Sequence, residues 1–139
     1  MKYTIEIPTI EALETLTAVA HRKAQAWMLD KVSNEVESEA EIGGEEYTLE
    51  LSDCPYKADT FDVNEVQNTL RKMGFMTTYY PRKAELLVEW NPRAQMELQR
   101  MKNSDTRWLF TTRAEHKEHE QQMFQSSGFI SGRPRKIGA

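Results

Sequence analysis

A long apolar stripe near the start of the chain limits how the protein can fold. Its members recur at spacings of three and four residues: Leu13, Leu16, Ala20, Ala24, Trp27, Met28 and Val32. This period places all of them on one face of an amphipathic α-helix, which has to bury that face against the rest of the chain. Thr9 is the expected N-cap of the helix, directly after Pro8, and Gly43–Gly44 is its expected end.

Four segments have the pattern of β-strands. Residues 2–7 and 47–51 alternate apolar with polar side chains, as half-buried strands do. Residues 76–80 and 84–90 are rich in β-branched, aromatic and other apolar residues. Residues 81–83 join these last two segments, and a loop of three residues suits a β-hairpin.

Three further helices are indicated by their end signals. Asp62 and Glu65 have the spacing of a capping box, and Gly74 is placed to end that helix. Asn91 followed by Pro92 is a typical helix start, and it predicts a helix to about residue 102. Asp105 is expected to cap a last helix that runs through Trp108 to Phe124.

These elements predict an α+β fold in the order β-α-β-α-β-β. We expect a small mixed or antiparallel sheet with helices on one face, followed by C-terminal helices and a flexible tail. A chain of 139 residues most often forms one domain with one hydrophobic core. We therefore predict an α+β domain over residues 1–102 and a C-terminal helix with an extended basic tail over residues 103–139.

The charges are unevenly distributed along the chain. Residues 1–60 hold 5 Lys/Arg against 13 Asp/Glu, whereas residues 61–139 hold 13 against 9. This asymmetry marks either an electrostatic face or two halves that each solvate their own surface. Cys54 is the single cysteine, so a disulfide within the chain is excluded and an intracellular setting is expected. No apolar run approaches the about 18 residues that span a bilayer, so we expect no membrane contact.

Few residues are candidates for chemistry. His116 and His119 lie three residues apart on one helical face, which could hold zinc, but the H-E-x-x-H spacing of metalloprotease helices is absent. Cys54 has no histidine close in sequence, and His21 stands beside Arg22, where a surface role is the default. No phosphate-binding loop, dinucleotide fingerprint or G-x-S-x-G motif occurs. We therefore expect no catalytic residues, no bound metal and no cofactor.

The C-terminal third has more apolar side chains than its polar helix can bury. We predict that Trp108, Phe110, Phe124 and Phe129 are anchors for a protein partner, because apolar clusters on polar elements mark interfaces. The alternative for the first of these residues is that the start of the helix packs back on its own domain. The partner would be another copy of the chain or a different subunit, so an oligomer or complex is expected.

Nucleic acid is a second, minor candidate partner. Basic and aromatic residues occur together at the expected hairpin tip and in the tail: Tyr80, Arg82, Lys83, Arg133, Arg135 and Lys136. Phosphate contacts and base stacking use these residue types. The sequence pI of about 5.5 argues against a broad basic surface.

The stretch from about Ala18 to Trp90 resembles small uncharacterised proteins of tailed phages. The shared pattern is an amphipathic helix, the strand EEYTLEL, a helix that ends in Leu70-x-x-x-Gly74-Phe75, and the strand ELLVEW. The resemblance implies a phage or mobile-element setting, in the host cytoplasm or the virion, and carries no catalytic residues. It implies a non-enzymatic virion or accessory component or, alternatively, a phage-encoded regulatory factor that binds a host protein or nucleic acid.

Overall fold

The computed structural model describes residues 6–104 and 107–130, with side chains described as far as residue 123. Its elements follow one another in the order α1 (Ile10–Glu41), β1 (Glu46–Glu50), the 3-10 turn η1 (Leu51–Asp53), α2 (Thr60–Lys72), β2 (Met76–Tyr80), β3 (Glu85–Glu89), α3 (Pro92–Asn103) and α4 (Arg113–Ile130). The fold is α+β, as the sequence predicts. The strand expected over residues 2–7 lies mostly outside the described residues, and Glu6 and Ile7, which are described, are exposed and form no strand.

The three strands form an antiparallel sheet in the order β1-β3-β2. Leu49 of β1 is paired with Leu86 of β3, and Thr77 of β2 with Val88 of β3, so these four residues share one face of the sheet. All four are at most 1% exposed. This face is the one that packs against helices.

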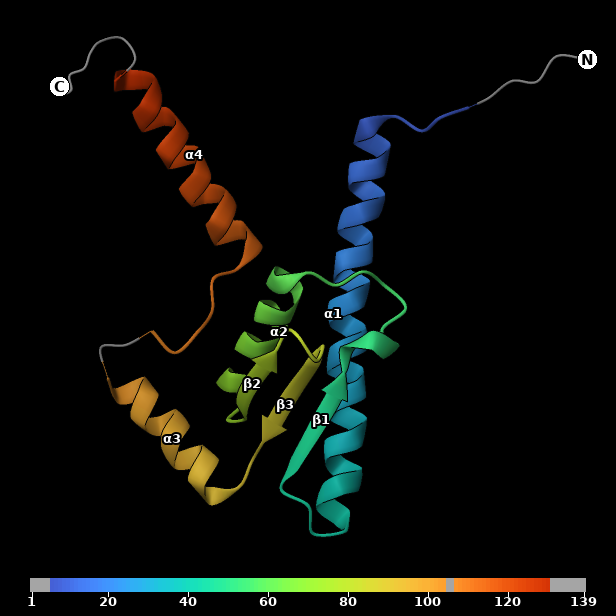
Figure 1. The fold of residues 1–139 in the computed structure, drawn as a ribbon, viewed down its shortest axis with the longest axis vertical. Coiled ribbons are helices and arrows are strands. Elements are labelled where there is room, and N and C mark those ends of the chain that lie inside the picture. The colour runs from blue at the N-terminus through green and yellow to red at the C-terminus, as the bar shows by residue number, and fades with distance from the viewer. Residues whose placement is uncertain (1–5, 105–106, 131–139) are drawn as a thin grey trace, which may run out of the picture.

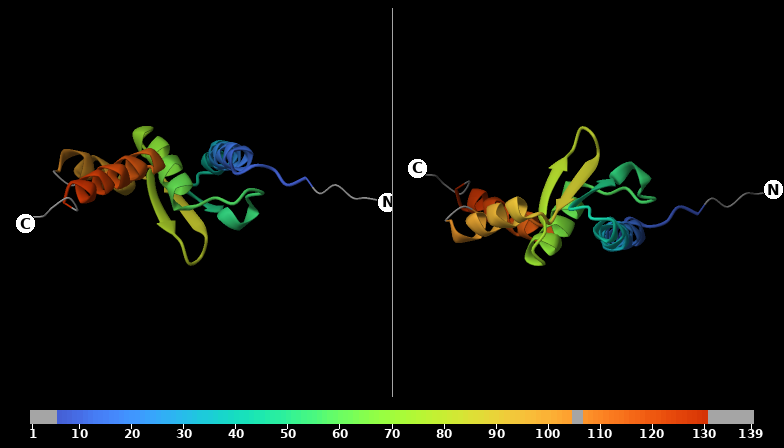
Figure 2. Two further views of the ribbon diagram at one scale, coloured as in Figure 1. Left: turned by 90° about the horizontal axis from the view of Figure 1, so that it is seen from above. Right: turned by 90° about the horizontal axis from the view of Figure 1, so that it is seen from below.

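Helices α1 and α2 cover the buried face of the sheet together. Three residues from α1, three from α2 and three from the sheet form a single buried cluster: Ala24, Met28, Val32, Val63, Val66, Leu70, Leu49, Leu86 and Val88. Figure 2 shows the β2–β3 hairpin extending away from the layer that α1 and α2 form. The arrangement with helices on one face of a small sheet is therefore confirmed.

The ends of α1 are those that the sequence indicates. The Thr9 hydroxyl accepts a hydrogen bond from the Ala12 amide at 3.1 Å, as an N-cap does. At the other end Gly43 has φ +88°, which L-residues with a side chain rarely adopt, and its amide donates to the Ala40 carbonyl. In contrast, the apolar stripe is buried only from Ala24 onward, and Leu16 near the N-terminus of the helix is 62% exposed.

The N-cap of α2 lies three residues earlier than predicted. Asp59 is the N-cap, and its carboxylate accepts from the Asp62 amide while the Asp62 carboxylate accepts from the Asp59 amide. The capping box is therefore Asp59–Asp62, and the predicted pair of Asp62 with Glu65 is wrong. The predicted end is confirmed, because Gly74 has φ +104° and the Phe75 amide reaches back to the Leu70 carbonyl.

The hairpin and α3 also follow the sequence. Strands β2 and β3 are joined by a turn at residues 81–84, and Asn91 caps α3 by accepting from the Ala94 amide at 2.8 Å, with Pro92 at the first helical position. The last helix differs from the prediction. Residues 107–112 are extended or irregular, and α4 begins at Arg113 instead of near Asp105.

The start of α4 is set by a capping box that the prediction missed. The Thr112 hydroxyl accepts from the Glu115 amide, and the Glu115 carboxylate accepts from the Thr112 amide at 3.1 Å.

Helix α4 and the first turns of α1 project beyond the sheet toward the top of Figure 1, with their outer ends far apart. Among the described residues, no helix has the length and apolar content needed to span a membrane.

Candidate functional site

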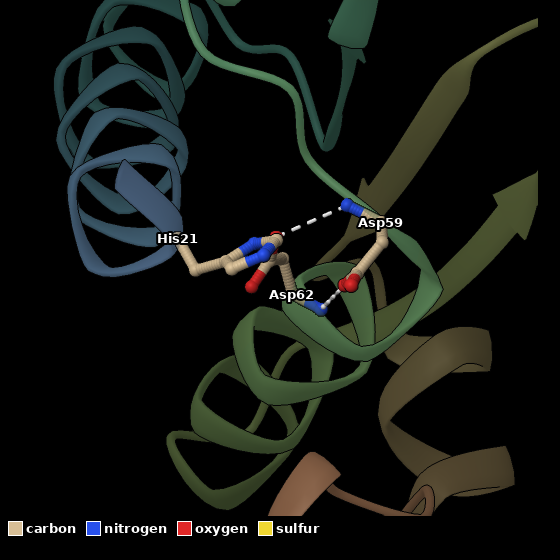
Figure 3. A group of neighbouring side chains, drawn as sticks. All are labelled: His21, Asp59 and Asp62. Carbon is tan, nitrogen blue, oxygen red and sulfur yellow. Dashed lines mark hydrogen bonds and ion pairs between the residues drawn. The ribbon is translucent and has the colours of Figure 1, made fainter. Parts of the chain in front are cut away.

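Four polar residues from three helices meet where α4 joins the body of the protein. His21 comes from α1, Asp59 and Asp62 come from the start of α2 (Figure 3), and Arg113 is the first residue of α4. Asp62 is fully buried. Its carboxylate accepts from Nδ1 of His21 at 2.7 Å, from the Gln25 side chain at 2.9 Å and from the Asp59 amide at 3.0 Å. We call His21, Asp59, Asp62 and Arg113 the α4 junction.

Arg113 supplies the positive charge of the α4 junction. Its guanidinium lies 2.6 Å from an oxygen of Asp59 and 3.3 Å from an oxygen of Asp62. Partial burial would raise the pKa of Asp59, but hydrogen bonds from the Asp62 amide and from Arg113 outweigh it and lower that pKa. Burial likewise opposes the shift at Arg113, whose pKa is raised by the hydrogen bonds and charges of the two aspartates. Each partner thus stabilises the charged form of the other.

The α4 junction contains the atoms of a potential metal site, but they are already occupied. One ligand atom from each of His21, Asp59 and Asp62 lies within 4.8 Å of the others. However, His21 Nδ1 donates to Asp62, and the guanidinium of Arg113 contacts both carboxylates. A metal ion would have to displace the Arg113 guanidinium from both carboxylates. The residues present fit a structural ion pair better than a metal centre.

A row of polar side chains on α2 holds the segment that leads into α4. Asn64, Asn68 and Arg71 are spaced by four and three residues, so they lie on one face of the helix. Asn68 donates to the Phe110 carbonyl at 3.0 Å and accepts from the Phe110 amide at 2.8 Å. Asn64 donates to the Thr111 carbonyl at 2.9 Å. These contacts hold the main chain of Phe110 and Thr111 against α2.

Arg71 joins this segment to the sheet. The side chain is 5% exposed, and burial lowers its pKa, although the charge of Glu97 partly opposes that shift. Its guanidinium donates to the Thr77 hydroxyl and carbonyl and to the Trp108 carbonyl, at 2.8–3.0 Å. It also lies 4.5 Å from the centre of the Phe110 ring. A buried arginine with these contacts fixes the 107–112 segment.

The predicted partner anchors therefore fall into two groups. Trp108 and Phe110 are half-buried on their own chain, where Lys102 and Arg71 lie over their rings. Their placement favours the alternative that this segment packs back on its own domain. Phe124 and Phe129 lie within α4, but their side chains are outside the described residues. The predicted domain boundary after residue 102 stays a prediction, although hydrogen bonds from α2 to residues 108–111 cross it.

The predicted nucleic-acid contacts are partly described. Tyr80, Arg82 and Lys83 are exposed at the β2–β3 turn, and the Lys83 ammonium lies 5.7 Å from the Tyr80 ring centre. Arg133, Arg135 and Lys136 lie outside the described residues. The structure thus gathers one small basic and aromatic tip.

The histidines and the cysteine are placed in different surroundings. His116 is paired with Glu120 at 2.8 Å and stacks on Phe61 with ring centres 5.0 Å apart, whereas His119 is exposed. Cys54 is half-buried against the core cluster. Beside His21 lies an open groove of about 560 Å³, whose lining includes Thr17, Ala20 and Tyr56 but not Cys54. The groove therefore adjoins a half-buried histidine paired with a buried aspartate, and Cys54 is not among its lining residues.

Sequence reasoning missed the α4 junction because its members are far apart in the chain. His21 and Asp62 are separated by 41 residues, and Asp62 and Arg113 by 51. One local signal was available: Thr112-x-x-Glu115 has the capping-box pattern and places the helix start at Arg113.

Comparisons of the chain with protein-family models, with curated proteins and with solved structures find no match.

Proposed function

We propose that the protein is a non-enzymatic binding or structural component that docks on another protein subunit through α4. The observation that supports this proposal most directly is the exposure of the helix. Every side chain from Lys117 to Met123 is exposed, and Met123 is 58% exposed. An isolated helix of 18 residues with a polar surface is marginal in water, because most helix stability comes from tertiary packing. A partner that packs along α4 would supply that stability.

The attachment of α4 suits such a role. The first turn is fixed by the ion pairs of Arg113 and by the contact of His116 with Phe61. The buried Asp62 ties Arg113 to α1 and α2, so the direction of the helix is set by the body of the protein. A helix held in its binding direction loses less conformational entropy when a partner binds. Met123 and the helix residues Phe124 and Phe129 are the proposed apolar contacts.

The setting we propose is that of a tailed phage, as a virion or accessory protein in the host cytoplasm or the particle. The resemblance of residues 18–90 supports this setting. The partner would then be another virion subunit, a second copy of the chain or a host protein.

Truncation tests the proposed function. A chain that ends after Lys117 keeps α1–α3, the segment bound to α2 and the ion pairs of Arg113, but lacks the exposed part of α4. It should unfold cooperatively with little loss of helix in α1–α3, as measured by circular dichroism, and should lose its place in the native assembly. The matched control is Met96→Ser, which removes a 74% exposed methionine from α3 and should leave assembly unchanged. If the truncated chain still assembles, as measured by its abundance in purified complexes, α4 is not the docking element.

A second candidate is a regulatory factor that binds a host protein or nucleic acid through the β2–β3 tip. The supporting observation is the exposed cation–aromatic pair of Lys83 and Tyr80 beside Arg82. Arg82→Glu with Lys83→Glu should abolish a salt-sensitive gel shift with single-stranded nucleic acid. Arg93→Glu with Arg100→Glu, an equal charge change on α3, should weaken it much less. Equal losses in the two variants would exclude a specific contact at the tip.

A further inference from the structure

An open cavity of about 370 Å³ lies where α1 and α2 end and α3 begins. These three helix ends lie on the side of the molecule away from α4 (Figure 1). The cavity is lined mainly by apolar side chains, namely Val36, Ala40, Met73, Phe75 and Trp90. Its volume is in the range of about 300–1,000 Å³ that small-molecule sites usually have. Because its lining residues come from α1, α3 and the segments that follow α2 and β3, its role is independent of the proposed function.

Two aromatic rings form adjoining walls of the cavity. The ring centres of Phe75 and Trp90 are 6.2 Å apart, and the two ring planes meet at 85°. The face of an aromatic ring carries partial negative charge and attracts cations. Within the described part of the chain, a lysine or arginine lies 4.5–5.8 Å from the ring centres of Phe61, Tyr80, Trp108 and Phe110. No such cation of the same part of the chain lies over Phe75 or Trp90.

The polar side chains at the cavity offer acceptors to a ligand. Glu37 is exposed and forms no ion pair with any described residue. Gln95 donates from its side-chain nitrogen to the Trp90 carbonyl at 2.6 Å, which leaves its side-chain oxygen to accept. Among the described residues, no lysine or arginine lines the cavity. A neutral ligand would displace water from Glu37 without pairing with it, whereas a cation would pair with it.

The helix ends at the cavity add to its negative potential. Helix α1 ends at Glu41 and has no basic residue in its last turn, and Met73 is the C-cap of α2. The C-terminal end of a helix carries partial negative charge, because its last carbonyl groups lack partners within the helix. Helix α2 has Arg71 and Lys72 in its last turn, so the end of α1 makes the larger contribution.

We propose that this cavity binds a small organic cation whose nitrogen carries alkyl groups, such as a quaternary ammonium ion. Such an ion has no N–H to donate, and aromatic rings and a carboxylate are the groups that recognise it. Its alkyl groups would contact Val36, Ala40 and Met73, and its charge would be shared by the rings and Glu37. A primary ammonium is strongly hydrated and would lose its water at walls that are mostly apolar. The chemistry of the cavity therefore favours an alkylated nitrogen.

Titration of the full chain with choline, followed by NMR, tests the proposal. The indole N–H signal of Trp90, identified by its absence in Trp90→Phe, should move with a dissociation constant of about 1–10 mM. The Trp108 signal should stay in place, because Lys102 already lies over that ring. The neutral analogue of choline, with carbon in place of nitrogen, should bind at least about fivefold more weakly. Equal affinity for the two ligands, or a Trp90 signal that does not move at about 50 mM choline, would overturn the proposal.

Two matched charge changes test the place of Glu37. Glu37→Gln should weaken choline binding about threefold and leave binding of the neutral analogue unchanged. Glu41→Gln makes the same charge change on the same helix, at an exposed residue that is not among those lining the cavity, and should leave the dissociation constant unchanged. Equal weakening by the two variants would show that choline responds only to overall charge, which would overturn the site.

Removal of the Trp90 ring tests the aromatic wall. Trp90→Leu keeps an apolar wall and should weaken choline binding about fivefold or more, measured at the Gly74 amide signal. Thermal unfolding of this variant shows whether its fold is kept, and the Glu37 and Glu41 variants decide the question if it is not. Unchanged choline binding in a folded Trp90→Leu chain would refute the role of the ring. Truncation after Lys117 leaves every lining residue in place, so a failure of docking through α4 would leave choline binding unchanged.

Discussion

The α4 junction predicts a large effect for Asp62→Ala. The substitution removes a fully buried carboxylate that accepts from His21, Gln25, the Asp59 amide and Arg113. Removing one partner of a fully buried ion pair costs about 3–5 kcal/mol. Here the His21 and Arg113 side chains are 22% and 27% exposed, so water can replace part of what is lost. The lost capping contact at the start of α2 adds about 0.5–1 kcal/mol. We expect the free energy of unfolding to fall by about 3 kcal/mol.

Urea unfolding followed by tryptophan fluorescence measures this loss, because Trp27 is partly buried against the core cluster. Asp62→Asn keeps an acceptor without the charge and should cost about half as much. Asp30→Ala removes an exposed acid from α1 and should stay within about 0.5 kcal/mol of the parent chain. Asp62→Ala combined with Arg113→Gln should cost less than the sum of the two single changes. If Asp62→Ala lowers the free energy of unfolding by less than about 1 kcal/mol, the Asp62 carboxylate does not hold the α4 junction together.

Three further changes have defined outcomes. Asn68→Ala removes both hydrogen bonds to Phe110 and should lower the free energy of unfolding by about 1–3 kcal/mol. Hydrogen exchange at the Phe110 amide should become faster, and an unchanged exchange rate would contradict the role of Asn68. Gly74→Ala places a side chain at φ +104° and should lower the free energy of unfolding in urea by about 1–2 kcal/mol. An unchanged urea midpoint would show that the backbone at this turn can adopt another conformation without a loss of stability. The pKa of Asp59 is lowered, so its pairing with Arg113 stabilises the fold above the ordinary value of 3.8 and is lost as pH falls through the lowered pKa. The stability difference between the parent chain and Arg113→Gln should therefore shrink below that pH, and a constant difference would exclude the ion pair as its cause.

The elements that could be predicted are those whose signals are local. The ends of α1 and the start of α3 follow from Thr9, Gly43 and Asn91, because capping and left-handed turns involve neighbours in the chain. The one-sided covering of the sheet follows from apolar periodicity in the same way. A local rule still failed at α2, where both Asp59 and Asp62 can cap. Asp59 is the N-cap, and Asp62 is the third residue of the helix. The Asp62 carboxylate completes the capping box and also binds His21 and Arg113 in the α4 junction.

The parts that could not be predicted depend on contacts between distant residues. Nothing near His21 in the sequence indicates that Asp62 will face it, and its charged neighbours favoured a surface role. Trp108 and Phe110 have the composition of a partner site, but Arg71, Asn68 and Asn64 on α2 bind the main chain of their segment. Polar side chains that recognise main-chain atoms place no requirement on the sequence they bind. For this reason residues 108–111 carried no signal for their docking.

Hydrogen exchange of α4, measured in the isolated protein and in its native assembly, tests the central claim most directly. In the isolated chain, amides beyond Lys117 should exchange much faster than those of α2, because exposed helices open locally at small free-energy cost. In the assembly the same α4 amides should become at least tenfold slower, while those of α2 stay unchanged. If α4 exchanges equally fast in both states, the helix is not the docking element and the proposed function is wrong.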